Sequence, residues 1–209
     1  MNITVQGILL SIPGVIIAVT LHEYTKSLVA YKLGDKGIKD QRRLAPNPLK
    51  HMDILGSIFL VVFGYGWASP VRLVPNSFKD RRGAMLFIFV MPFLVNIIVG
   101  AAFAIGASIF YANAIYMAAA LDYETIRTIV TILHLVAVYN ISFALFSLIP
   151  IYPLNGTHLL WALKPIWAVK LTQYEAMLKV LLVFFIALTF ARQVFEPITL
   201  RVIWALSVF

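Results

Sequence analysis

The chain has 209 residues, of which 61% are hydrophobic and 12% charged, and its mean hydropathy is +0.90. This composition excludes an ordinary soluble domain and predicts an integral membrane protein. The net charge of +8 then indicates basic loops beside anionic lipid, and we do not expect nucleic acid as a partner. The absence of cysteine excludes disulfides and thiolate metal ligands.

Four apolar segments reach the length of about 20 residues that a helix needs to cross a bilayer. The first lacks a basic leader and runs beyond the length of a signal peptide, so we interpret it as an uncleaved span. The second exceeds one span, and we expect it to tilt, to bend near Pro92 or to continue beyond the lipid. The four segments run from Ile3 to Tyr31, from Ala84 to about Leu121, from about Ile126 to Ile149 and from about Tyr174 to Ala191.

A fifth apolar stretch, Ile54 to Trp67, is too short and too rich in glycine for a straight span. Basic residues dominate on both sides of it, in Lys32 to Lys50 and in Arg72 to Arg82. If this stretch crossed the membrane, one basic loop would face outward, against the usual distribution of charge. We therefore expect residues 32–83 to form basic cytoplasmic loops around a re-entrant hairpin, with a small hairpin or strand region between residues 35 and 80.

The remaining segments complete an all-α polytopic membrane protein with one domain, residues 1–209. The acidic connection around Asp122 and Glu124 is expected outside, and residues 193–209 are expected to form an interfacial C-terminal helix. We expect a multi-pass protein of a bacterial cell membrane. The sequence leaves the oligomeric state open.

Three ionisable residues, His22, Glu23 and Lys26, interrupt the first span within one helical turn. Their spacing is that of H-E-x-x-H, in which two neutral imidazoles bind zinc and the glutamate acts as general base. Lysine replaces the second histidine here. A protonated amine offers no lone pair and repels a cation, so Lys26 is not expected to bind zinc.

The second polar cluster breaks the end of the third span, in "YNISFALFSLIPIYPLNGTHLLWAL" (residues 139–163). Breaks in a helix at membrane depth persist only where protein or a cavity satisfies the freed backbone groups. A loop at the membrane boundary is the alternative interpretation. The residues that we expect to contact a partner or substrate here are Asn140, Pro150, Pro153, Asn155 and Gly156.

Together these two stretches resemble the site-2 protease family of intramembrane zinc metalloproteases. That family pairs H-E-x-x-H with a later N-x-x-P-x-x-P-L-D-G-type motif. The segments "NPLKHMDILG" (residues 47–56) and "GWASPVRLVPNSF" (residues 66–78) also resemble family segments, so that the similarity extends over nearly the whole chain from about Ile12. The resemblance implies a site-2-protease-like helical core, with His22 as a metal ligand and Glu23 as general base.

The departures from the family pattern fall at the positions that would bind the metal and the substrate. Lys26 and Asn155 replace the second histidine and the aspartate ligand, so one of three protein ligands remains. Met91 stands before Pro92 where the family has glycine, Asn96 falls one residue late, and Ser147 replaces the usual asparagine. Contacts with a substrate that the resemblance would imply are therefore not carried over.

The two ligand substitutions balance in charge. In the family, the zinc ion is neutralised by the aspartate and the glutamate, whereas Lys26 and Glu23 here neutralise each other without a metal. We therefore expect an ion pair between Glu23 and Lys26, with Asn155 and His22 hydrogen-bonded around it. The alternative for Lys26 is that it extends to the cytoplasmic interface.

Two functions follow from the resemblance. The first is a catalytically inactive pseudoprotease that binds a transmembrane helix of a partner protein and needs no cofactor. The second is an active intramembrane zinc metalloprotease with a non-standard site, in which Glu23 activates water. A rearranged site of His22, Asn155 and His158 is one form of the second, although an amide is a weak zinc ligand. His51 and His134 are expected to be structural.

Overall fold

The computed structural model describes residues 4–117 and 121–207. Within these residues the chain is mainly helical and contains no strand, and three helices are long and apolar enough to cross a membrane. They are α1 (Val5–Leu33), α4 (Arg81–Ala112) and α6 (Tyr123–Phe146). The all-α polytopic membrane fold predicted from the sequence is confirmed.

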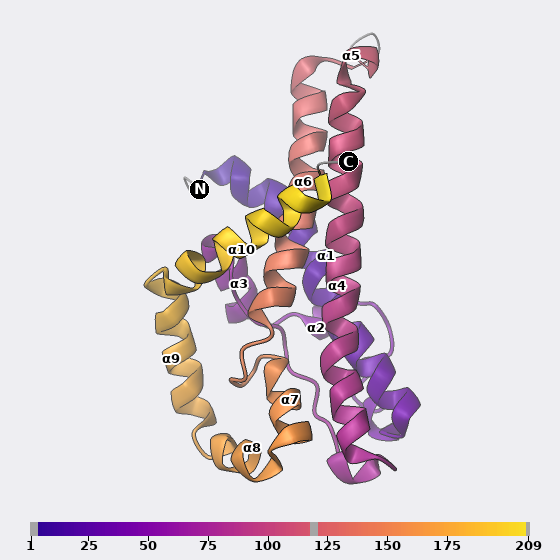
Figure 1. Cartoon of the computed structure of the whole chain (residues 1–209), viewed down its shortest axis with the longest axis vertical. Helices are drawn as coiled ribbons and strands as arrows, with labels where there is room; N and C mark the ends of the chain where they lie inside the picture. Colours follow the sequence, from indigo (N-terminus) through magenta and orange to yellow (C-terminus); the bar gives the residue numbers. More distant parts are fainter. Residues whose placement is uncertain (1–3, 118–120, 208–209) are drawn as a thin grey trace.

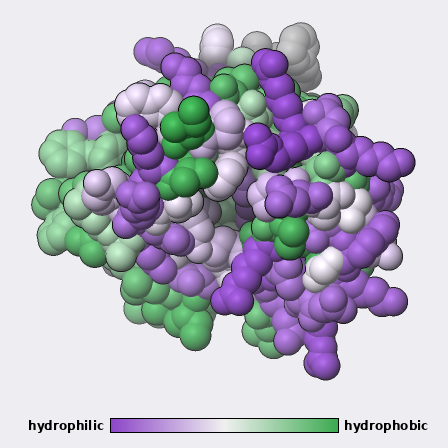
Figure 2. All heavy atoms as spheres, turned by 90° about the horizontal axis from the view of Figure 1, so that it is seen from below, coloured by the Kyte–Doolittle hydropathy of each residue, from purple (hydrophilic) through white to green (hydrophobic). Residues whose placement is uncertain are grey.

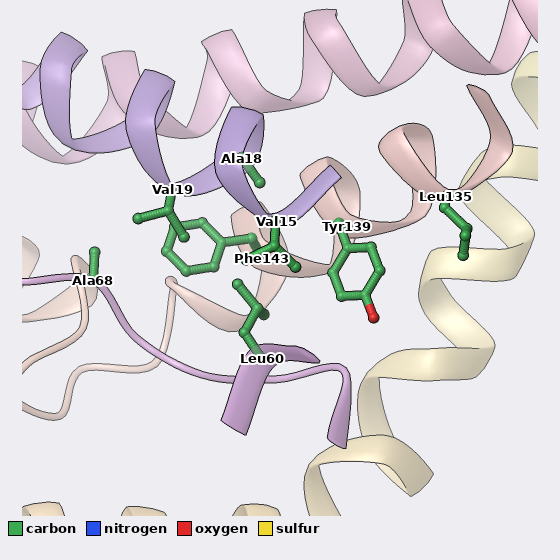
Figure 3. Packing of buried hydrophobic residues seen from close by; sticks show 8 residues of the cluster. All are labelled: Val15, Ala18, Val19, Leu60, Ala68, Leu135, Tyr139 and Phe143. Carbon is green, nitrogen blue, oxygen red and sulfur yellow. The ribbon is translucent and has the colours of Figure 1, made fainter. Parts of the chain in front are cut away.

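These three helices pack side by side and form the core of the molecule (Figure 1). Between α1 and α6, Phe143 points toward Val15 and Val19, and Leu60 reaches the same cluster from α3 (Figure 3). Asn96 on α4 donates from Nδ2 to the Ala18 carbonyl at 3.1 Å, which ties α4 to α1. The side chains that the sequence places in the first span are therefore enclosed by protein on more than one side.

Helix α4 is longer than a bilayer is thick. Its 32 residues extend for about 48 Å at 1.5 Å per residue, against about 30 Å of hydrocarbon. Pro92 lies inside this helix and does not end it. The helix begins before the predicted boundary because Asp80 caps it, accepting from Gly83 N at 3.0 Å. Beyond Ala112 the chain continues through α5 (Ala114–Met117), so the second segment does extend past a single span as expected.

The region between α1 and α4 contains short elements, η1 (Lys36–Ile38), α2 (Pro48–His51), α3 (Ile54–Phe63) and η2 (Pro75–Ser77). Helix α3 ends at Gly64, whose φ of 82° lies in the left-handed region, and the chain then returns in an extended conformation. A Cβ atom on Gly66 would lie 2.1 Å from the Gly56 carbonyl oxygen, so only glycine permits this return. The predicted hairpin is thus a helix against an extended segment. In place of a strand pair, residues 35–80 contain one isolated bridge, between Met52 and Ala68.

After α6 the chain forms α7 (Gly156–Leu163), α8 (Pro165–Thr172), α9 (Glu175–Ala187) and α10 (Phe190–Ser207). The fourth predicted span, Tyr174 to Ala191, is not one straight helix. Helix α9 has 13 residues, about 20 Å, and joins α10 at an angle of 66°. Thr189, with a φ of 62°, lies at this bend.

The C-terminal helix begins three residues earlier than the predicted 193–209 and packs across α6 and α4. Ala191, Thr199 and Ile203 on it are buried, and Ser142 on α6 donates to Thr199 Oγ1 at 3.2 Å. Residues 208 and 209 of the predicted helix lie outside the described part of the chain. Viewed from the end where α7 and α8 lie, the surface is mostly hydrophilic, with hydrophobic side chains along its margin (Figure 2).

Candidate functional site

The three ionisable residues of α1 are all buried. His22 is 1% exposed, and Glu23 and Lys26 are each 2% exposed. Lys26 Nζ donates to Glu23 Oε1, so the structure contains the expected ion pair and Lys26 does not extend to the interface. The two residues are three apart and share one face of the helix. Ser27 Oγ also donates to the Glu23 carbonyl, at 2.8 Å.

His22 packs against Phe143 with its ring edge-on, the two ring centroids lying 5.1 Å apart. Neither ring nitrogen has a hydrogen-bond partner among the described residues. The expected hydrogen bond from His22 to the ion pair is therefore not formed.

Asn155 stands at the N-terminal end of α7 and is buried. Its Nδ2 donates to the Phe89 carbonyl on α4 at 2.8 Å, so this amide holds α7 against α4. We had expected it to bond to the Glu23–Lys26 pair instead. Gly156 N donates to the Ser147 carbonyl at 2.7 Å. A Cβ atom at Gly156 would lie 2.2 Å from the Leu148 carbonyl oxygen, so the turn after α6 requires glycine here.

A cavity of about 300 Å³ opens beside the ion pair. Lys26 and His158 line it, together with the extended segment from Pro70 to Pro75 and side chains of α7, α8 and α9. Of the residues expected to contact a partner, Pro150 and Pro153 line this cavity, whereas Asn140, Asn155 and Gly156 do not. Asn140 instead donates to the Val136 carbonyl on its own helix, at 2.8 Å.

His158 also lines the cavity, although the sequence suggested it only as a ligand in a rearranged zinc site. Burial and the nearby Lys26 ammonium lower the pKa of His158 to about 3, so its imidazole is neutral at physiological pH. Its Nδ1 is buried without a partner in the part of the chain that the structure describes. The available signal was its position, three residues after Asn155 on the same face of a short helix.

Two further cavity residues, Tyr152 and Glu175, were not predicted from the sequence. Burial and the Glu175 carboxylate raise the pKa of Tyr152 to about 12. Both residues line the cavity. Nothing in their local sequence distinguishes them, because the turn after α6 positions Tyr152 and the folding of α8 and α9 positions Glu175.

The other two histidines lie elsewhere. His51 is fully buried on α2, with its Nε2 2.9 Å from the Ala45 carbonyl oxygen, and burial lowers its pKa. His134 is exposed on α6 and lines a second cavity of about 450 Å³ between α1, α6 and α10. That cavity is larger, but none of the motif residues His22, Glu23, Lys26 or Asn155 lines it.

The donors of the site do not fit a zinc ion. A catalytic zinc site uses three protein ligands, and no group of three His, Asp or Glu residues within 4–117 and 121–207 could hold a metal. Lys26 Nζ donates to the carboxylate that would act as general base, and the amide of Asn155 donates to a carbonyl.

Fold and site together define a polytopic membrane protein with a metalloprotease-like motif buried in a spanning helix. The chain is 32% identical over 162 residues to the protein named "Putative zinc metalloprotease YwhC" of Bacillus subtilis (strain 168), an alignment that covers 77% of this chain and 72% of that relative. The chain therefore belongs to the metalloprotease family of this relative. No family model matches the chain, and no solved structure matches it either.

Proposed function

We propose that this chain is a non-catalytic member of the family, of the site-2 protease type, which binds a membrane-spanning partner in the cavity beside Lys26. The observation that carries the proposal is the buried ion pair of Glu23 and Lys26, in the place where the resemblance puts a metal ligand and a general base. We also infer that the basic loops around residues 32–83 face the cytoplasm of a bacterial cell.

Electrostatics supports the loss of the metal. An ammonium has no lone pair for zinc, and its charge repels a divalent cation. With Lys26 paired to Glu23, the site is already neutral, and a zinc ion would add two buried positive charges without the aspartate that Asn155 replaces.

The cavity supports the binding of a partner. It lies beside the former catalytic position and is lined mainly by apolar side chains, among them Leu160, Trp161 and Leu178. An apolar lining with a few polar groups is typical of a ligand site. Because the cavity adjoins spanning helices, its natural occupant is a segment of another membrane protein.

Metal analysis of the purified chain tests the first half of the proposal. We expect no zinc above that of a sample treated with chelator, and no cleavage of membrane-spanning substrates. Stoichiometric zinc that disappears in His22→Ala would contradict the proposal.

Photo-crosslinking in native membranes tests the second half. A photoreactive residue at Trp161, which lines the cavity, is expected to form an adduct with a membrane-spanning protein. The adduct should disappear when Ala168→Phe fills the cavity, because Ala168 is a buried lining residue. The matched control is Ala102→Phe on the exposed side of α4, which should leave the adduct unchanged. An adduct that survives Ala168→Phe would argue against binding in this cavity.

One observation favours the second candidate, an active zinc metalloprotease with a non-standard site. Both ring nitrogens of His22 and Nδ1 of His158 are buried without partners among the described residues, and such nitrogens are metal ligands elsewhere. The metal analysis above decides between the candidates, since this one requires zinc that depends on His22.

A further inference from the structure

The Lys26 ammonium can donate more hydrogen bonds than the described chain accepts from it. An ammonium carries three N–H groups, and one bond from Nζ is formed among the described residues, to Glu23 Oε1. The Lys26 side chain is 3% exposed and lines the cavity. Its remaining N–H groups can therefore donate to a molecule that is bound in the cavity.

The charge of the site indicates which acceptor fits. Lys26 and Glu23 cancel, so an occupant that brings a carboxylate would leave a net buried negative charge, which a low-dielectric surround disfavours. A neutral carbonyl accepts the same hydrogen bond and leaves the site neutral. The main chain of a membrane protein carries one such carbonyl on every residue.

The hydrogen bonds of that main chain indicate its conformation. The carbonyls inside an α-helix are already paired, whereas extended backbone leaves its carbonyls free to accept from Lys26. The cavity beside Lys26 therefore suits a few residues of extended chain.

The carboxylate of the lining lies on the side of α9. Glu175 is the acidic residue among the described lining residues. Tyr152 hydrogen-bonds to its carboxylate, but no salt bridge within the described chain neutralises its charge. A basic residue next to the extended segment would complement it. Such residues flank spanning segments on their cytoplasmic side.

We propose that the cavity binds a short extended segment of the partner, next to a basic residue, and that Lys26 donates a hydrogen bond to one main-chain carbonyl of this segment. The unpartnered Nδ1 of His158, in the same cavity, is available to the adjacent peptide group. In this arrangement the lysine holds a peptide carbonyl without activating it. The inference rests on the proposed function and names the part of the partner that is bound.

A labelled, acetylated and amidated pentapeptide of alanine, valine and leucine that ends in lysine serves as the probe for the full-length chain in detergent. Each main-chain amide of the probe is replaced in turn by an alkene of the same shape. Binding is measured to the native chain and to Glu23→Gln/Lys26→Met, which removes the donor and keeps the site neutral. The matched control, Arg192→Met/Glu196→Gln, neutralises the ion pair of α10 in the same way, away from this cavity.

One alkene position is expected to weaken binding to the native chain and to the control variant by about tenfold or more, the effect of losing a hydrogen bond to a charged donor. The same replacement should have no effect on Glu23→Gln/Lys26→Met, which is expected to bind the unmodified probe about tenfold more weakly than the native chain because it lacks this hydrogen bond.

Three results would overturn the inference: native binding weaker than about 1 mM, an alkene effect equal in both proteins, or tighter binding of the free-acid probe than of the amide. If the crosslink at Trp161 still forms and still depends on the cavity, the proposed function stands and only the contact with Lys26 is wrong. If the crosslink fails as well, both are wrong.

Discussion

A buried ion pair on a spanning helix is the residue-scale feature on which the proposed function depends. Each charged side chain near the centre of a bilayer costs roughly 2.5–3.5 kcal/mol on insertion scales. Glu23 and Lys26 meet this cost by pairing, with both side chains 3% exposed and shielded by the packing of α1 against α4 and α6. Neutrality of the pair, and not either charge by itself, is what the surrounding protein tolerates.

Removal of one partner should therefore be worse than removal of both. We expect Lys26→Ala or Glu23→Ala to lower the free energy of unfolding by about 3–5 kcal/mol, because each leaves an unpaired buried charge. Glu23→Gln/Lys26→Met should lose much less. Denaturant unfolding in detergent, followed by tryptophan fluorescence, measures the three changes. Equal losses in the single and double variants would mean that the two charges are not coupled.

His158 gives the site a dependence on pH. Its pKa is about 3 in the folded chain, against 6.5 for the free side chain. Between these values the unfolded chain binds a proton that the folded chain does not, so stability is complete above pH 6.5 and is lost as the pH falls toward 3. We expect His158→Phe to flatten this loss in thermal unfolding recorded from pH 7 to pH 4, while His51 contributes equally to both proteins. Identical slopes would contradict the assignment.

At the scale of elements, the turn between α6 and α7 positions the cavity. Gly156 packs against the carbonyls of Leu148 and Ile149, just beyond the end of α6, and Asn155 holds α7 to α4. This turn brings His158 under α1, where His158 and Lys26 line one cavity. Asn155 and Gly156 of the motif therefore contribute to backbone packing at this turn.

A substitution at this turn should be far more disruptive than one in a free part of a helix. Gly156→Ala would place a methyl group against backbone atoms that cannot move aside, and we expect a loss of about 3 kcal/mol, at the upper end of overpacking effects. Gly106→Ala is the control, since a Cβ atom there meets nothing within 4 Å. It should be neutral or stabilise α4 by up to about 1 kcal/mol. Similar unfolding midpoints for the two variants would count against the tight turn.

At the scale of the whole molecule, the question is how much of a metalloprotease scaffold persists. Helices α1, α4 and α6 pack against one another and α7 packs on α4, and the motif positions on α1 and at the start of α7 are buried. The 32% identity to the relative named as a metalloprotease extends over 162 residues, which is 77% of this chain.

Restoration of the missing ligands would test the scaffold directly. We expect Lys26→His/Asn155→Asp to bind zinc stoichiometrically, because the change supplies an imidazole and a carboxylate in addition to His22. Each single variant should bind little. Metal analysis after dialysis measures the content, and His22→Ala in the restored background should abolish it. A metal-free double variant would mean that the three positions do not converge as the resemblance implies.

Much of the fold could be predicted because it follows from local hydrophobicity. The spans of α1, α4 and α6, the short apolar α3 and the break after α6 each have a signal in their own residues. The bend at Thr189 has none, since neither glycine nor proline marks it, and the fourth span was therefore predicted as one helix. The hairpin or strand region expected between residues 35 and 80 is a helix against an extended segment and contains no strand among the described residues. An extended segment becomes a strand only if a partner lies in register, and here one bridge is formed.

The sequence by itself determined that this is a helical membrane protein and that Glu23 and Lys26 can pair, because both follow from composition and from helical spacing. Only the tertiary structure decided that the pair is buried, that Asn155 bonds to α4 and not to the pair, and that His158, Tyr152 and Glu175 share a cavity with Lys26. The reason is physical. Hydrophobicity acts on each segment separately, whereas a cavity and its charges arise where segments distant in the chain meet.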